Sequence, residues 1–201
     1  MQKFDIIFIG AGPAGYVGAL YASRRGLKVA VIDDKLVGGT CLNKGCIPTK
    51  ALLAISHQLD DLKKSEELGI ISGQIKVDFS KIAERKDAIV LKLRSGIELL
   101  LKARSVALFN QKAKIISPGK IAVGKDVLEA EHIVIATGSS PKVMDIFSPF
   151  KKYVLTSDEL VNIKTIPPRL AIIGGGAIGC EYADMFSGFG SKVTLIELMD
   201  R

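Results

Sequence analysis

A glycine-rich segment that occurs twice constrains this chain more than any other feature. Shifting residues 10–33 by 164 positions places them on residues 174–197 without a gap. In both copies an apolar run leads into a G-x-G-x-x-G pattern, and an acidic residue follows 18 positions after its last glycine. These coinciding residues are Gly10, Gly12, Gly15 and Asp33 in the first copy, and Gly174, Gly176, Gly179 and Glu197 in the second. The chain therefore carries two copies of one strand–turn–helix–strand unit.

In this context the glycine pattern is typical of dinucleotide binding. The first glycine makes a tight turn, the second lets the backbone approach a pyrophosphate, and the third lets helix and strand pack closely. The acidic residue accepts a hydrogen bond from a ribose hydroxyl, and the helix N-terminus faces the phosphates. The alternative is a pair of structural turns without a ligand. The complete strand–turn–helix context of both copies disfavours that alternative.

The apolar periodicity predicts an α/β fold. We expect strands and helices to alternate in two Rossmann-like βαβ units, of which the second is incomplete. The expected strands and β-like runs are 4–9, 28–33, 106–109, 115–116, 121–123, 127–129 and 132–136. The expected helices are 13–25, 48–64 and 80–103, and a strand–helix–strand unit spans 169–197. We place the first domain at residues 1–145 and the start of a second at 146–201.

Two cysteines lie close together in the segment GGTCLNKGCIPTK, at Cys41 and Cys46. In a regular helix their Cα atoms would be about 8.6 Å apart, from the helical rise and radius, which is too far for a disulfide. If they pair, the backbone between them is not regular helix, and Gly45 is where it can deform. Pro48 suits a first helical position, which places Cys46 near a helix N-terminus, where its thiolate is favoured, with Lys50 nearby. The pattern indicates a redox-active dithiol; the alternatives are two ordinary buried thiols and, less well, a metal site.

Composition and charge exclude several classes of protein. The net charge is +7, but the cations are scattered and aromatic residues are only 6%, so we expect no nucleic-acid partner and at most an attraction for anionic ligands. No run of 18 apolar residues exists, which argues against a membrane-spanning helix. Three cysteines, with Cys180 far from the other two, do not form a secreted disulfide framework. We expect a reducing, cytoplasmic environment and assign no metal ligands, and no role to His57 or His132.

The run GGTCLNKGCIPTK after GAGPAG, with IATGSSP and GGGAIGCEYA downstream, resembles the disulfide oxidoreductase flavoproteins. Among them the chain is most similar to the dihydrolipoamide dehydrogenases. Leu42, Ile47 and the Pro-Thr-Lys ending favour these over the glutathione and mercuric reductases, which share the C-x4-C frame. Thioredoxin reductases carry a C-x2-C in the second nucleotide domain, and this sequence has none there. Lys44 departs from the apolar residue that many relatives have.

The resemblance implies that the first glycine segment binds FAD and the second binds NAD. Cys46 faces the flavin, Cys41 exchanges with the substrate disulfide, and Lys50 approaches the flavin and pairs with Glu181. The residues that the resemblance assigns to FAD are Gly10, Gly12, Gly15, Asp33, Thr40, Cys41, Lys50, Ala113, Thr137, Gly138 and Ser139. Those that it assigns to NAD are Gly174, Gly176, Gly179 and Glu197. Cys180 lies among Ile178 and Ala183 in the helix of the second βαβ unit and is expected to be a buried structural thiol.

The family's proteins are more than twice as long as this chain, and a later domain supplies a His–Glu pair to the partner subunit as catalytic base. We therefore expect a fragment of the enzyme, in which the 201 residues alone turn over little substrate. The resemblance further implies a homodimer at full length and lipoyl domains of 2-oxoacid dehydrogenase complexes as partners. The location implied is the cytoplasm, or the mitochondrial matrix in a eukaryote.

Two other functions remain open at the level of the sequence. One is a different disulfide or mercuric-type reductase of the same fold, which runs from a nicotinamide nucleotide to its substrate. The other is a non-catalytic nucleotide-binding module in which the dithiol is incidental. Flavin absorbance separates the enzymes from the module, and substrate profiling separates the two enzymes.

Overall fold

The computed structural model describes residues 2–71 and 73–200. The chain forms two compact units, each built from two segments of the sequence. Unit 1 comprises Met1–Asn43 and Val90–Ser140, and unit 2 comprises Lys44–Ile89 and Pro141–Arg201. The long helix α4 (Phe79–Ala103) contributes residues to both.

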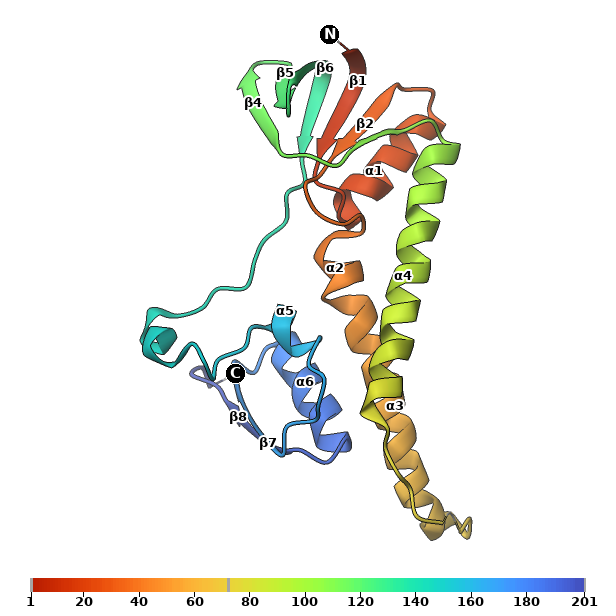
Figure 1. Cartoon of the computed structure of the whole chain (residues 1–201), viewed down its shortest axis with the longest axis vertical. Coiled ribbons are helices and arrows are strands. Elements are labelled where there is room, and N and C mark those ends of the chain that lie inside the picture. The colour runs from red at the N-terminus through yellow and green to blue at the C-terminus, as the bar shows by residue number, and fades with distance from the viewer. Residues whose placement is uncertain (1, 72, 201) are drawn as a thin grey trace. The chain divides into compact units, whose positions relative to one another are not determined.

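Unit 1 is built on a six-stranded mixed sheet (Figure 1). The strands are β1 (Gln2–Ile9), β2 (Val29–Ile32), β3 (Ala107–Phe109), β4 (Ala113–Ser117), β5 (Lys120–Val123) and β6 (Asp126–Ile135). Their order is β3-β2-β1-β6-β5-β4. The first four in that order run parallel, and β5 and β4 add an antiparallel hairpin to the edge of β6. The sheet therefore places the carboxyl ends of β1, β2 and β6 at one edge.

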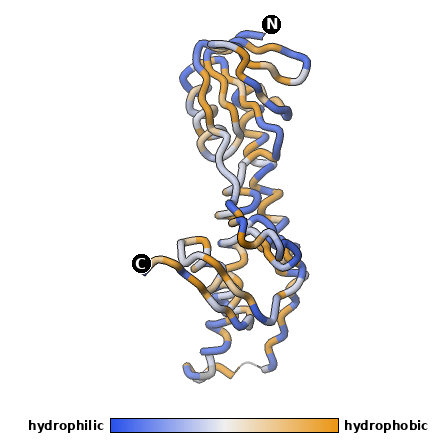
Figure 2. Tube along the Cα trace, turned by 90° about the vertical axis from the view of Figure 1, so that its left-hand side faces the viewer, coloured by the Kyte–Doolittle hydropathy of each residue, from blue (hydrophilic) through white to orange (hydrophobic). Residues whose placement is uncertain are grey.

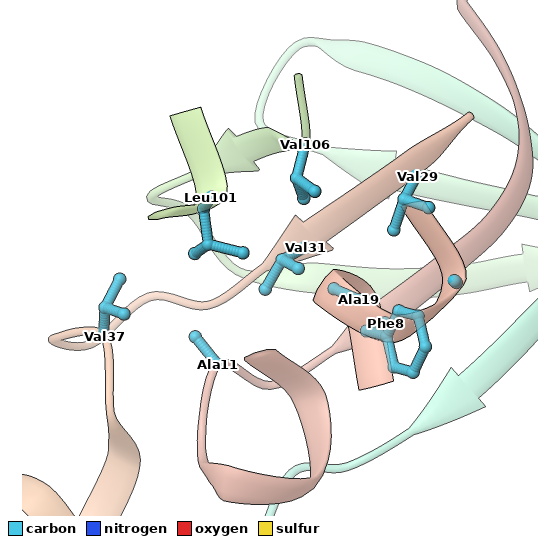
Figure 3. Packing of buried hydrophobic residues seen from close by; sticks show 9 residues of the cluster. Phe8, Ala11, Ala19, Val29, Val31, Val37, Leu101 and Val106 are labelled. Atoms are coloured by element: carbon cyan, nitrogen blue, oxygen red, sulfur yellow. The ribbon is translucent and has the colours of Figure 1, made fainter. Parts of the chain in front are cut away.

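Strand β2 is buried on both faces, as a central strand of a parallel sheet requires. Val29 and Val31 contribute to one hydrophobic cluster, and Ala30 and Ile32 contribute to another on the opposite face. Figure 3 shows the first cluster, in which Leu101 of α4 lies beside Val31. Figure 2 shows hydrophobic residues running along the strands and polar residues at the turns. Both faces of β2 therefore contribute to the core of unit 1.

Helix α1 (Pro13–Arg24) packs on the first of these faces through small residues. Its buried positions are Gly15, Ala19 and Ala22, spaced at one helical face. A Cβ on Gly15 would clash with the carbonyl oxygen of Gly10, the first residue after β1. The helix can approach the sheet so closely only because this position is glycine.

Unit 2 contains a two-stranded parallel sheet and the second βαβ segment. The strands are β7 (Arg169–Ile173) and β8 (Lys192–Ile196), with helix α6 (Ala177–Gly188) between them. The remaining elements are α3 (Cys46–Lys64), η1 (Ser65–Leu68), the first part of α4, η2 (Asp145–Phe150) and α5 (Ser157–Leu160). A hydrophobic cluster joins α3, α5 and α6 through Leu52, Leu160, Met185 and Phe186. Among the smaller contacts, Ser56 donates a hydrogen bond to the Met185 carbonyl at 3.0 Å.

The α/β fold expected from the sequence is confirmed, and three local expectations are corrected. The runs 127–129 and 132–136 belong to one strand, β6, because both pair with neighbouring strands without interruption of the backbone. Helix α3 begins at Cys46, so Pro48 is its third residue and not its first. The short helices α2 (Gly39–Asn43) and α5 were not expected, since neither is long enough to show a periodic pattern.

We predict that Gly15→Ala lowers the free energy of unfolding by about 1–3 kcal/mol, the usual cost of overpacking. The added Cβ meets a backbone oxygen, which cannot rotate away as a side chain can. Gly96→Ala is the matched control, because Gly96 lies within α4 and has open space around it. That change should leave stability unchanged or raise it by up to about 1 kcal/mol through helix propensity. Thermal unfolding of both variants tests this; equal effects would contradict the packing argument.

Candidate functional site

The first glycine segment forms a tight turn between β1 and α1. Gly10 has a φ of +111°, and its N–H donates to the carbonyl of Ile32 at 2.7 Å. A Cβ on Gly10 would clash with the carbonyl of Ala136, where β6 ends. Gly12 caps α1 without any side-chain hydrogen bond, and Pro13 follows it. The turn thus presents backbone N–H groups at a helix N-terminus, the arrangement that binds phosphate.

Asp33, at the end of β2, braces this turn. Its Oδ2 accepts a hydrogen bond from the Ala11 N–H at 2.7 Å, and its Oδ1 accepts from Lys35 N–H at 2.9 Å. An ionised carboxylate has about four acceptor sites. After these two bonds, capacity remains for ribose hydroxyl groups. The carboxylate therefore can shape the turn and contact a ligand at once.

The second glycine segment repeats this geometry in unit 2. Gly174 has a φ of +106°, and its N–H donates to the Ile196 carbonyl at 2.8 Å. Gly176 caps α6, again without a side-chain hydrogen bond. A Cβ on Gly179 would clash with the Gly174 carbonyl, as at the equivalent pair in unit 1. The internal repeat of the sequence is thus a repeat of local structure.

Glu197 takes the place that Asp33 has in the first copy. Its Oε2 accepts from the Gly175 N–H at 2.6 Å, and its Oε1 accepts from the N–H groups of Leu198 and Met199 at 2.7 and 2.9 Å. The hydrogen bonds from Met199, Gly175 and Leu198 lower the pKa of Glu197. The carboxylate is therefore a fixed negative charge beside the second turn.

A cavity of about 760 Å³ opens beside the second turn, within unit 2. Its lining comes from the segment between Pro141 and Ser157, from β7, and from the start of α6, including Gly174, Gly176 and Gly179. The lining is largely apolar, with Lys142 contributing a cation. A concave apolar site with a few polar groups is the usual form of a small-molecule site.

The dithiol segment runs from α2 into α3. Cys41 lies half-buried in α2, and Cys46 is the exposed first residue of α3. The helix is interrupted at Lys44 and Gly45, and Gly45 caps α3 with φ −126° and ψ −112°. The backbone between the cysteines is therefore not regular helix, as a disulfide between them requires. Cys46 lies at the N-terminus of α3, as expected from the sequence.

Asn43 is a residue of this segment whose importance the sequence did not reveal. Its Nδ2 donates to the carbonyls of Val37 and Gly39 at 3.0 and 2.8 Å. Its Oδ1 accepts from Nε and Nη2 of Arg94 at 2.9 and 2.6 Å. One amide side chain thus holds α2 to the loop before it and to α4. The contacts are distant in sequence, and no local pattern marks them.

Two charged pairs link α3 and α6. The ammonium of Lys50 contacts the carboxylate of Glu181, as the resemblance implies. His57, which the sequence left without a partner, lies with Nε2 2.7 Å from Oδ2 of Asp184. The hydrogen bond to Asp184 raises the pKa of His57, against a small opposing effect of burial. No partner for His57 was evident from the sequence, because Asp184 comes from another helix, 127 residues away.

The remaining expected site residues fall in different places. Thr137, Gly138 and Ser139 follow β6 directly and are exposed, and Thr137 N lies near the Gly10 turn. Thr40 is exposed in α2. Ala113 begins β4, at the edge of the sheet opposite β3. Cys180 donates a hydrogen bond from Sγ to the Gly175 carbonyl at 3.1 Å. It is exposed, so the expectation of a buried thiol is wrong, because α6 buries Tyr182, Met185 and Phe186 instead.

Among residues 2–71 and 73–200, no three histidine, cysteine, aspartate or glutamate side chains gather in a way that could hold a metal ion. Within the same residues, none of the helices has the length and apolar character needed to cross a membrane.

The fold and the two braced glycine turns define an α/β protein of the dinucleotide-binding class with a C-x4-C segment. Residues 4–201 match the sequence family described as pyridine nucleotide-disulphide oxidoreductase. The chain belongs to this family of oxidoreductases.

Relatives and solved structures agree with this assignment. The chain is 43% identical to the dihydrolipoyl dehydrogenase of Acholeplasma laidlawii over 99% of its own length and 61% of that protein's. It is 41% identical to a dihydrolipoyl dehydrogenase of Bacillus subtilis over 98% of its length and 44% of that protein's. It resembles the flavoprotein disulfide reductase RclA of Escherichia coli, solved as a Cu(II) complex, with a TM-score of 0.82 and 32% identity. That match covers 98% of this chain and 42% of RclA.

The chain spans about half the length of the curated relatives that it matches, from 43% to 61% for three of them. The matched part includes both glycine turns and the dithiol segment.

The His57–Asp184 pair predicts a specific dependence of stability on pH. Because the folded-state pKa of His57 is raised above 6.5, the pair stabilises the fold fully below that pH. The stabilisation is lost as the pH rises through the folded-state pKa. Asp184→Asn should therefore lower the melting temperature at about pH 6 and leave it nearly unchanged at about pH 8.5. Thermal unfolding at the two pH values measures this.

Imidazole NMR supplies the control for this prediction. Asp184→Asn should lower the pKa of His57 toward 6.5, whereas Asp145→Asn, an exposed change in η2, should leave it unchanged. An unchanged titration in the Asp184 variant would refute the pairing.

Proposed function

We propose that this chain is part of a flavin-dependent enzyme that oxidises protein-bound dihydrolipoamide with NAD through Cys41 and Cys46. The observation that carries the proposal is the C-x4-C segment with Cys46 at the first position of α3, close in sequence to a braced dinucleotide turn. The relatives named dihydrolipoyl dehydrogenase, 36–43% identical over nearly the whole chain, support the substrate class.

The first glycine turn fits FAD. No side chain hydrogen-bonds to the N-terminus of α1, so its N–H groups can receive the pyrophosphate. Asp33 retains acceptor sites for the adenosine ribose. At Gly12 a Cβ would meet only the Cα of Gly39, at 3.8 Å, so the backbone there is open to a close ligand. We assign residues 1–145 to FAD and 146–201 to the start of NAD binding. The division by packing differs, because residues 44–89 pack with 141–201.

The second glycine turn fits NAD. No side chain hydrogen-bonds to the N-terminus of α6. Glu197 lies where it can accept a hydrogen bond from the adenosine ribose. The cavity at Gly174–Gly179 offers an apolar surface for the rest of the nucleotide. A 2′-phosphate placed at Glu197 would meet a carboxylate held in its charged form. The electrostatics therefore favour NAD over NADP.

The reaction we propose begins with thiol–disulfide exchange. A thiolate of dihydrolipoamide attacks Cys41 of the disulfide, the Cys41–Cys46 bond breaks, and Cys46 leaves as a thiolate. The mixed disulfide joins the first substrate sulfur to Cys41. The second substrate thiolate then attacks this first substrate sulfur, which closes the disulfide of lipoamide and releases Cys41 as a thiolate. The substrate loses two electrons and two protons, and the protein gains a dithiol. When held at the first glycine turn by the N-terminus of α1 and Asp33, FAD would supply the two-electron acceptor for this dithiol, and NAD at the second turn would supply the final acceptor.

Other side chains of the chain support these steps. The helix dipole at the start of α3 stabilises the departing Cys46 thiolate. Lys50 brings a cation one turn further along α3, and Glu181 orients it. In the proposed enzyme a His–Glu pair of the partner subunit accepts the substrate proton. We propose a homodimer, lipoyl domains of 2-oxoacid dehydrogenase complexes as partners, and a cytoplasmic location.

A second candidate function is supported by the resemblance to RclA. The chain would then belong to a disulfide or metal-ion reductase that passes electrons from a nicotinamide nucleotide to the substrate. Turnover of dihydrolipoamide with NAD, compared with NADH-driven reduction of Cu(II) and of low-molecular-weight disulfides, decides between the two. A third reading, a non-catalytic nucleotide-binding module, requires that the purified protein show no flavin absorbance.

The roles of the two cysteines make different predictions for their serine variants. A thiolate beside an oxidised flavin gives a long-wavelength absorbance band. With FAD bound, Cys41→Ser should show this band, because Cys46 is then a thiolate next to the flavin. Cys46→Ser should lack it, although Cys41 remains. Visible absorbance of the two variants measures the difference, and the reverse pattern would exchange the roles assigned here.

The second nucleotide site makes a prediction about NADH and NADPH. The chain should bind NADH more tightly, because a 2′-phosphate is repelled by Glu197. Glu197→Ala should reduce this preference by about tenfold, because the like charge facing the 2′-phosphate is removed. Binding titrations followed by nucleotide fluorescence measure it, with Asp200→Ala as a control that alters a neighbouring acid. Equal affinity of the unmodified chain for both nucleotides would contradict the proposal.

A further inference from the structure

Lys44, the residue at which the dithiol segment departs from the pattern of its family, has a defined partner in unit 2. It lies between α2 and α3, two residues before Cys46. Its Nζ is 3.1 Å from Oδ2 of Asp158 in α5. The Asp158 side chain is only 23% exposed, compared with 51% for that of Lys44. The anion is thus the more firmly placed partner of the two.

The short helix α5 that carries Asp158 is held at its N-terminal end. Thr156 caps it, and the Glu159 carboxylate accepts hydrogen bonds from the Thr156 N–H and hydroxyl at 2.7 and 2.9 Å. These bonds lower the pKa of Glu159, to which the charge of Lys44 also contributes. The hydroxyl of Tyr182, on α6, donates to the Ser157 carbonyl at 3.0 Å. A single helical turn, unstable alone, is thereby fixed.

The C-terminal end of α5 is held by a buried cation. The Lys86 side chain is 4% exposed, and its Nζ donates to the Val161 carbonyl at 3.2 Å and to Oδ1 of Asn162 at 3.0 Å. Asn162 in turn donates from Nδ2 to the carbonyl of Asp158 at 3.1 Å. Burial of an ammonium is costly unless it is hydrogen-bonded, so these contacts strongly favour one position of the chain here.

We propose that the ion pair between Lys44 and Asp158 is a positioning contact that restrains the segment between Cys41 and Cys46 and so promotes their disulfide. The inference rests on the proposed function, because it takes these cysteines as a redox pair. Asn43 is held by Arg94, and the adjacent Lys44 is held by Asp158. A restrained segment loses less conformational entropy when the disulfide closes. Lys44 is therefore a positioning residue and not a catalytic one.

The equilibrium with glutathione tests this proposal. Two glutathione thiols reduce the protein disulfide: the Cys41–Cys46 bond breaks, glutathione disulfide forms, and two electrons and two protons pass to the protein. The whole 201-residue chain in a Cys180→Ser background is equilibrated at fixed ratios of reduced to oxidised glutathione. The mixture is quenched with acid and alkylated, and the masses give the fractions of dithiol and disulfide. Asp158→Asn and Lys44→Met should each favour the dithiol by about two- to fivefold, the range of partly exposed ion pairs.

The two variants separate restraint from simple charge effects. Lys44→Met removes a cation and Asp158→Asn removes an anion, so a purely electrostatic effect would shift the equilibrium in opposite directions. Loss of the restraint shifts the equilibrium of both variants in the same direction, toward the dithiol. The double variant should match each single one, because the contact is already lost. Lys44→Arg should keep the original equilibrium, and Asp145→Asn is the matched control for loss of an acid in unit 2.

The outcomes of this experiment are distinct. A shared shift toward the dithiol, retained in the double variant and absent in Lys44→Arg, supports the positioning role. Opposite shifts, or none, overturn it while leaving the proposed function intact. If the starting chain forms no Cys41–Cys46 disulfide at any glutathione ratio, both the inference and the proposed redox pair fail. Thermal unfolding confirms that each variant is folded. If Asp158→Asn does not fold, Lys44→Met still tests the positioning role, because it changes an exposed residue between two helices.

Discussion

The contact on which the rest of this structure depends is the close approach of a helix to the strand before it, at a glycine that cannot carry a Cβ. Gly15 lies against the Gly10 carbonyl in one unit, and Gly179 lies against the Gly174 carbonyl in the other. This approach turns the N-terminus of the helix toward the space above the strand ends. The carboxylate at the end of the next strand then ties the turn in place. Steric fit, helix polarity and one hydrogen bond together make a cradle for a dinucleotide.

The dithiol segment depends on the same framework. It begins soon after β2, whose position the first turn fixes, and it starts the helix that carries Cys46 and Lys50. The interruption at Lys44 and Gly45 gives the segment a conformation that a continuous helix would forbid. The redox role that we propose for this segment draws on two features of α3, its N-terminus at Cys46 and the pairing of Lys50 with Glu181.

Much of this could be predicted from the sequence because the signals are local. The glycine turns, the acidic residues at positions 33 and 197 and the break near Gly45 all follow from short patterns with a steric or electrostatic cause. Contacts between distant segments could not be predicted from local patterns, and the Lys50–Glu181 pair was expected only from the family resemblance. Asp184 reaches His57 from 127 residues away, and Arg94 reaches Asn43 from 51. The union of two short runs into β6 likewise depends on pairing with β1 and β5, which a single strand's pattern does not contain.

The central claim is that the two glycine turns are separate sites for two different nucleotides. Hydrogen–deuterium exchange of the chain with FAD, with NADH and with both measures this most directly. FAD should slow exchange at residues 10–16 and 33–35, and NADH should slow it at residues 174–180 and 197–199. The two effects should add when both nucleotides are present. Protection of the same turn by both nucleotides, or of neither turn by either one, would contradict the account.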